Sequence, residues 1–187
     1  MKLLKGDYGY ITHRKKVQLI KIIIGVALVI AVLVTGIVTT GSRRNLLTVG
    51  SVLLVLPVAN IAVNYIAMFC FKKLSNEEAE EFKAASEGKV TSCDMIVTAN
   101  QKLVPIQVSV VYKNGIVAYS NSKDLKRNEA EENMNKLLKA IGCSSTIRIM
   151  NEWKPFIRQV QSIEAPASEE EIVALEEVKY DLLKYSM

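Results

Sequence analysis

The chain has 187 residues, half of them hydrophobic, and a formal net charge of +5. Residues 1–73 hold ten Lys or Arg and one acid, whereas residues 74–187 hold fourteen Lys or Arg and eighteen acids. The second part therefore lacks the basic stripe of a nucleic-acid binder, and we expect no nucleic-acid partner. The only histidine is His13, which excludes ordinary Ser-His or Cys-His catalysis from residues 74–187.

Two uninterrupted apolar runs cover residues 22–40 and 46–71. Each is long enough to cross a hydrocarbon core, which takes about 20 residues of helix. Two buried core helices, or a cleaved signal peptide at the first run, are the alternatives, and the length of the runs disfavours both. We expect a transmembrane helical hairpin over residues 17–73, in the cell membrane.

Basic residues near the ends of the spans predict the orientation. They are frequent in the segment 1–16, predicted as an interfacial arm, and Lys72 and Lys73 follow the second span. The short loop between the spans carries only Arg43 and Arg44. Because cytoplasmic flanks are enriched in Lys and Arg, both termini are expected in the cytoplasm, next to anionic membrane lipid.

Each span carries residues suited to helix packing. In the second span, Asn60 and Asn64 lie one turn apart, after Pro57. An Asn side chain facing lipid is costly, so both are expected to face protein or water, in interhelical hydrogen bonds or along a solute pathway. Small residues recur every four positions in the first span, at Ala27, Ala31, Thr35 and Thr39. They would permit close approach between the two spans, or between copies of the chain in a homo-oligomer.

Residues 74–187 predict a small cytoplasmic α+β domain in which one helix, three strands, a helix, a strand and two helices follow one another. Ser75 with Glu78, and Ser168 with Glu171, have the spacing of capping boxes. The pair Asn114-Gly115 predicts a tight hairpin turn with positive φ at both residues. The expected helices cover 75–87, 124–141, 152–161 and 168–185, and the expected strands cover 93–98, 104–112, 116–119 and 146–150.

The last predicted helix is amphipathic, with its apolar side chains along one face. This stripe has three alternative uses: docking on the domain's own sheet, pairing with another copy, or binding a cytoplasmic protein partner. The partner-binding candidates are Ile172, Leu175, Val178 and Leu182.

Residues for catalysis are scarce. The element order is that of the restriction-endonuclease-like core, whose second and third strands supply metal-binding acids, yet these two strands contain none here. Asp94, Asp124 and Lys126 are the only candidate set, and we expect no cofactor or metal. The sequence favours a membrane-anchored, non-catalytic interaction or regulatory protein. The alternatives are a membrane-tethered enzyme with a degenerate fold of that kind, and an oligomeric conductor of small solutes.

The opening segment from Lys5 to Ile11, with the sequence KGDYGYI, precedes a basic stretch and the hairpin. In this order it resembles the start of an uncharacterised family of two-span bacterial membrane proteins. The resemblance covers mainly the N-terminal third of the chain. It implies a membrane hairpin and no activity.

Overall fold

The computed structural model describes residues 3–42, 45–122 and 125–187. The contacts between residues divide the chain into two units. The first unit holds residues 12–69. The second unit contains the N-terminal residues up to Ile11 together with residues 70–187. Arg43, Arg44 and Asp124, which carried predictions, lie outside the described residues.

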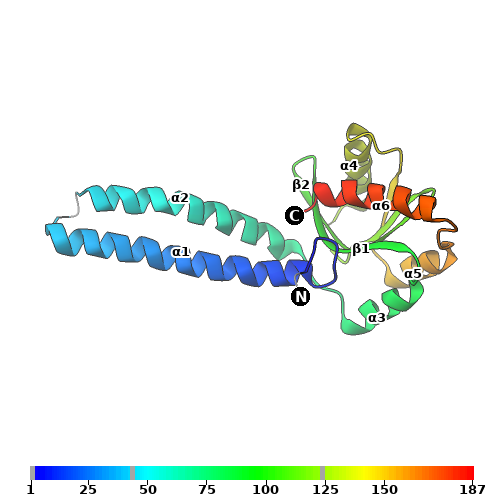
Figure 1. The fold of residues 1–187 in the computed structure, drawn as a ribbon, viewed down its shortest axis with the longest axis horizontal. Coiled ribbons are helices and arrows are strands. Elements are labelled where there is room, and N and C mark those ends of the chain that lie inside the picture. The colour runs from blue at the N-terminus through cyan, green and yellow to red at the C-terminus, as the bar shows by residue number, and fades with distance from the viewer. Residues whose placement is uncertain (1–2, 43–44, 123–124) are drawn as a thin grey trace. The chain divides into compact units, whose positions relative to one another are not determined.

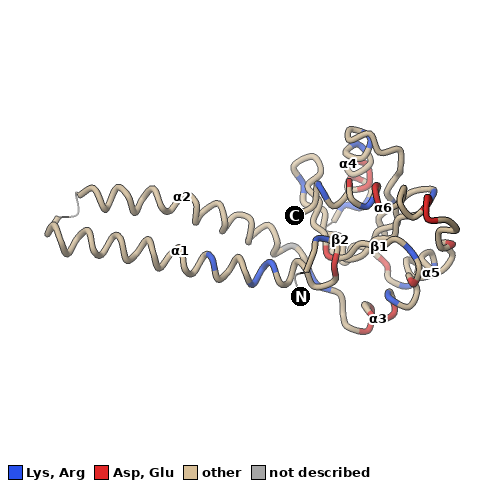
Figure 2. Tube along the Cα trace, in the orientation of Figure 1, with Lys and Arg blue, Asp and Glu red and all other residues tan. Residues whose placement is uncertain are grey.

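The first unit is built from α1 (Tyr10–Thr40) and α2 (Leu46–Ala67), which the short 3-10 helix η1 (Met68–Cys70) follows. Both long helices have the length and composition to cross a membrane. Only 6% of each apolar window is buried within the chain, whereas the core helix of a soluble protein would be mostly buried. The basic residues of α1 are confined to its first part (Figure 2). These helices are consistent with the predicted hairpin.

Two glycines of α1 allow α2 to approach closely. A Cβ atom at Gly25 would lie 2.6 Å from Cγ2 of Val58, and one at Gly36 would lie 2.8 Å from Cβ of Leu47. Asn45 joins the helices where α2 begins: its amide nitrogen donates to the Gly36 carbonyl at 2.8 Å, and its amide oxygen caps α2. Contact between α1 and α2 therefore depends on glycine rather than on the predicted ridge of Ala and Thr.

The second unit has the predicted order of elements, and it is an α+β domain (Figure 1). Its sheet has the strand order β1-β2-β3-β4, in which β1, β2 and β3 are antiparallel and β4 is parallel to β3. The sequence had left open where the fourth strand pairs. The elements are α3 (Asn76–Ala85), β1 (Val90–Ala99), β2 (Lys102–Tyr112), β3 (Gly115–Tyr119), α4 (Arg127–Ala140), β4 (Ile147–Met150), α5 (Trp153–Ser162) and α6 (Glu169–Lys184).

Helices cover both faces of the sheet (Figure 1). On one face, α4 and α6 bury the side chains of Met134, Leu138 and Leu182, each at most 1% exposed. On the other face, α3 contributes Phe82, and α5 contributes Phe156, which is fully buried. Met134 and Leu138 lie one turn apart on α4, as Phe156 and Val160 do on α5, so each helix buries one apolar face.

Local geometry differs from the prediction at two hairpin turns. The β2–β3 hairpin exists, but Tyr112 pairs with Gly115, so the two loop residues are Lys113 and Asn114. Two consecutive positive φ angles occur instead between β1 and β2, at Asn100 (49°) and Gln101 (62°). Such a pair fits the right-handed twist of a two-residue hairpin.

The helix caps confirm one prediction fully and one in part. The capping box of Ser75 with Glu78 is complete. At α6, Ser168 accepts from the Glu171 amide at 3.2 Å, but the Glu171 carboxylate accepts from the Ala167 amide instead. The helix predicted from residue 124 begins at Arg127.

The long strands β1 and β2 change faces in the middle of the sheet. Cys93 packs on the α3 and α5 face, whereas Met95 packs on the α4 and α6 face. Val108 and Ile106 on β2 show the same change. Residues two apart in a regular strand share a face, so the alternation of faces is broken in both strands here. The change falls at Asp94, whose φ is 48°.

Candidate binding site

A pocket of about 520 Å³ lies between α3 and the first two strands of the sheet. Its apolar wall comes from Phe82 and Val108, which are buried, and from Ala79. Tyr8, two residues before α1 begins, also lines it. The remaining lining residues are Asn76, Glu80, Lys83, Ser86, Thr91 and Cys93.

The N-terminal turn that carries Tyr8 is hydrogen-bonded to β1. The amide of Cys93 donates to the Gly6 carbonyl at 2.7 Å. The amide of Gly9 donates to Oδ2 of the buried Asp94, also at 2.7 Å. A hydrogen bond to a carboxylate is stronger than one between neutral groups. These bonds hold Tyr8 against the pocket, so the segment predicted as an interfacial arm belongs to the domain up to Ile11.

Gln107 fixes the segment that follows the apolar helices. Its side chain is fully buried, and its Nε2 donates to the Lys72 carbonyl at 3.0 Å. Its Oε1 accepts from the Asn121 amide at 2.9 Å. Next to Lys72, the ammonium of Lys73 lies 4.6 Å from the centroid of the Tyr8 ring, within cation–π range. Buried polar groups of the sheet thus hold both the segment that enters α1 and the one that leaves η1.

The hydroxyl of Tyr8 is buried and has no hydrogen-bond partner among the described residues. Buried polar groups without a partner are rare in folded proteins. The ring that carries this hydroxyl lines the pocket, so the unsatisfied group lies beside the candidate site.

Cys93 lines the pocket but is poorly suited to nucleophilic chemistry. Burial, and next the negative charge of Asp94, raise the pKa of the Cys93 thiol to about 12. The thiolate is the reactive form of cysteine, so Cys93 is an inert thiol near neutral pH.

The raised pKa predicts slow alkylation of Cys93 in the folded chain. Against an ordinary pKa of 9.0, a pKa of about 12 leaves about a thousandfold less thiolate at pH 8. We expect the iodoacetamide rate, measured by peptide mass spectrometry, to keep rising from pH 9 towards 12, whereas the rate in urea levels off near 9. The same shift makes stability fall across this range, because the unfolded thiol loses its proton first. Equal rates with and without urea at pH 8 would contradict the assignment.

The predicted partner-binding stripe of α6 is divided between core and surface. Leu175 and Leu182 are 8% and 1% exposed and belong to the core beneath α4 and α6. Val178 packs against the same core, and Ile172 is 37% exposed. In this fold most of the stripe is docked on the domain's own sheet, as the first of the three alternatives proposed.

The predicted packing residues of the spans lie mostly outside the α1–α2 contact. Ala27, Ala31 and Thr35 are exposed. Asn60 is also exposed, and Asn64 donates from Nδ2 to the Asn60 carbonyl of its own helix at 3.1 Å. Among the described residues, neither asparagine is hydrogen-bonded to α1.

The candidate catalytic set is not brought together in the described residues. Asp94 lies mid-strand, and Lys126 lines a different surface pocket with Gln101 at the tip of the β1–β2 hairpin. At about 3.3 Å per residue, seven residues of strand place Asp94 about 20 Å from that tip. No group of three His, Cys, Asp or Glu among the described residues is placed to hold a metal ion.

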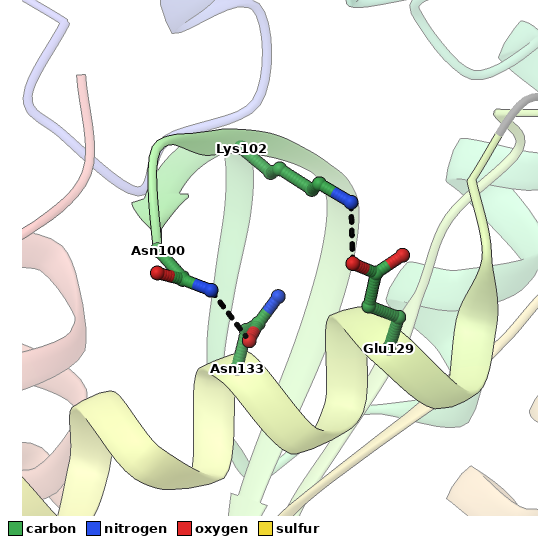
Figure 3. A network of polar contacts seen from close by, with 4 residues as sticks. All are labelled: Asn100, Lys102, Glu129 and Asn133. Atoms are coloured by element: carbon green, nitrogen blue, oxygen red, sulfur yellow. Dashed lines mark hydrogen bonds and ion pairs between the residues drawn. The ribbon is translucent and has the colours of Figure 1, made fainter.

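The tip of that hairpin is fastened to α4 by polar contacts (Figure 3). Nδ2 of Asn100 donates to Oδ1 of Asn133 at 3.4 Å, and the Lys102 ammonium pairs with the Glu129 carboxylate. The hydrogen bond from Lys102 lowers the pKa of Glu129. Both side chains of this pair are exposed, so it contributes little stability and serves to position the hairpin.

Sequence reasoning did not identify Tyr8, Gln107 or the pocket as a site. One signal was present, because Gln107 interrupts an apolar, valine-rich strand that is otherwise suited to burial. Its partners at Lys72 and Asn121 are 35 and 14 residues away, and local patterns do not show which distant groups meet.

The geometry defines a two-unit protein, with a pair of membrane-length helices and an α+β domain that holds the chain segments on both sides of them. Comparison with protein-family models, with curated proteins and with solved structures found no match.

Proposed function

We propose that this chain is a membrane-anchored, non-catalytic binding protein whose α+β domain binds its partner through the pocket beside α3. The helices α1 and α2 cross the bilayer, and the basic residues flanking them place both termini in the cytoplasm. The domain then lies at the inner membrane surface, with the basic segment around Lys72 and Lys73 next to anionic lipid.

One observation carries the proposal: the pocket is walled by Tyr8, which the domain holds two residues before α1. A molecule in the pocket would contact the domain and this entry segment at once. It would therefore stabilise the hydrogen-bonded arrangement of Gly6 and Gly9 on β1. A binding event would in this way be linked to the chain that enters the membrane.

The lining of the pocket indicates the chemistry of the occupant. Phe82, Val108 and the Tyr8 ring favour an apolar body, while Glu80 and Lys83 offer one charge of each sign at the rim. An apolar side chain of a protein partner, flanked by polar groups, fits this arrangement. Sites of this kind are concave and mainly apolar, with few polar groups.

Three titratable groups of the domain, Asp94, Cys93 and Lys89, have structural rather than chemical roles, which supports a non-catalytic function. Asp94 accepts from the Gly9 amide, and Cys93 is an inert thiol. The Lys89 ammonium donates to the carbonyls of Ala85 and Val160, near the C-terminal ends of α3 and α5, and burial lowers its pKa. Such donors satisfy carbonyls that a helix end leaves without partners.

Photo-crosslinking in the native membrane tests the proposal. Benzoylphenylalanine at Thr91, which is half-buried on the pocket rim, should crosslink a partner that SDS gels and mass spectrometry can identify. Replacing Ala79 with Trp fills the pocket and should remove the crosslink. The matched control is Ala84→Trp on the same helix, because Ala84 is exposed and does not line this pocket. Equal crosslinking in the two Trp variants would contradict the pocket as the binding site.

A further inference from the structure

The outer face of α2 carries a polar side chain that the hairpin leaves exposed. Val58 meets Gly25 of α1, so the inner face of α2 passes through Val58. Asn60 follows two residues later, about 200° further around a helix with 3.6 residues per turn. Its exposure agrees with this geometry. Asn60 therefore faces away from α1.

The Asn60 amide makes no hydrogen bond within the described part of the chain. The nearby Asn64 amide instead donates to the Asn60 backbone carbonyl. Asn60 lies seven residues before the end of α2 at Ala67, about 10 Å along the helix axis. In a membrane-spanning α2 this depth is within the hydrocarbon core, where water cannot satisfy an amide.

Asn60 is surrounded by an apolar helix face that no other described residue covers. Residues one to three turns away on the same side are exposed: Val49 (57%), Leu53 (61%), Leu56 (67%) and Val63 (64%). Lipid would suit these four side chains but not the amide among them. A second protein surface that offers both a donor and an acceptor at this height would satisfy the whole face.

We infer that α2 pairs with α2 of a second copy of this chain, with Asn60 of each copy hydrogen-bonded to Asn60 of the other. This inference rests on the membrane insertion in the proposed function. Two copies inserted with the same orientation place identical residues at the same height, and an isologous contact brings a surface against itself. An amide is self-complementary, because it carries both donors and an acceptor.

The small-residue ridge of α1 is the competing surface for such a pair. Its residues Ala27, Ala31 and Thr35 are exposed as well. The hydroxyl of Thr39, at the end of the same ridge, donates to the Thr35 carbonyl at 2.8 Å. This hydroxyl is satisfied within its own helix, so it does not require another chain. The Asn60 face has the stronger requirement for a partner.

Energy transfer between labelled full-length chains tests the inference in vesicles of phosphatidylcholine and phosphatidylglycerol. We expect a dimer whose affinity falls about tenfold in Asn60→Leu, since an interhelical hydrogen bond in a membrane contributes on the order of 1 kcal/mol. Asn64→Leu is the matched control and should keep the affinity. Unchanged dimerisation in Asn60→Leu would overturn the inference, and so would a loss confined to Ala31→Leu, which would place the contact on α1.

Carbonate extraction of the same vesicles separates the two proposals. A chain that resists extraction and remains monomeric at all protein-to-lipid ratios would overturn the α2 pairing and leave the anchored binding protein intact. A chain that carbonate removes would overturn both.

Discussion

Replacing Gly115 with Ala should destabilise the α+β domain by about 3 kcal/mol or more. Gly115 begins β3 with a φ of 146°, which L residues rarely adopt, and such strain costs about 1–3 kcal/mol. The added Cβ would also lie 2.4 Å from the backbone oxygen of Thr146. That oxygen accepts from the Ile116 amide at 2.8 Å, where β3 meets the start of β4. Relief of the clash would therefore separate the two parallel strands.

Urea unfolding of the full-length chain in detergent, followed by tryptophan fluorescence, measures this effect. Trp153 is the only tryptophan, and its ring lies 5.0 Å from that of Tyr119 on β3, so it reports on the domain. Gly142→Ala is the control, because Gly142 has a φ of 81° and nothing within 4 Å of an added Cβ. Backbone strain alone should cost this control about 1 kcal/mol. Equal losses in the two variants would show that the contact with Thr146 is unimportant.

Replacing Gln107 with Leu should cost about 2–4 kcal/mol and release the segment that follows the apolar helices. Leu keeps much of the volume but leaves the Asn121 amide without its acceptor, and each buried unsatisfied group costs about 1–3 kcal/mol. The Lys72 carbonyl loses the Gln107 donor and keeps only the longer contact from Asn121 Nδ2, at 3.3 Å. We therefore expect lower stability together with faster trypsin cleavage after Lys72 and Lys73.

Gln161→Leu on α5 makes the same chemical change at an exposed position and should alter stability by less than about 0.5 kcal/mol. Cleavage at Lys72 and Lys73 is measured by mass spectrometry in native buffer, where the domain remains folded. If Gln107→Leu lowers stability without faster cleavage there, Gln107 stabilises the sheet but does not hold the segment. If neither changes, the buried hydrogen bonds contribute no net stability.

Local patterns in the sequence were sufficient for the elements and their order. The uncharged runs predicted α1 and α2, since a helix of that length without charge suits a bilayer better than a small core. Met134 and Leu138, and likewise Phe156 and Val160, recur at helical spacing, which is sufficient to indicate the buried faces of α4 and α5. The Ser75 cap was predictable because its partner Glu78 is only three residues away.

Three features of the fold were not predictable from such local patterns. The β1–β2 turn has positive φ at Asn100 and Gln101, residues that are less typical of such turns than the Asn-Gly pair further on. The change of faces at Asp94 breaks the two-residue period on which strand reasoning depends. The hydrogen bond from Gly9 to Asp94 spans 85 residues of sequence.

The sequence alone thus determined the two membrane-length helices, the α+β class of the domain and the excess of basic residues beside the helices. All three follow from composition and from periodicities within a few residues. Only the tertiary structure decided that Tyr8 walls a pocket, that Gln107 holds the segment at Lys72, and that Asn60 faces away from α1. The physical reason is that burial and hydrogen bonding depend on which distant segments come into contact. Local patterns in a single sequence do not show which segments these are.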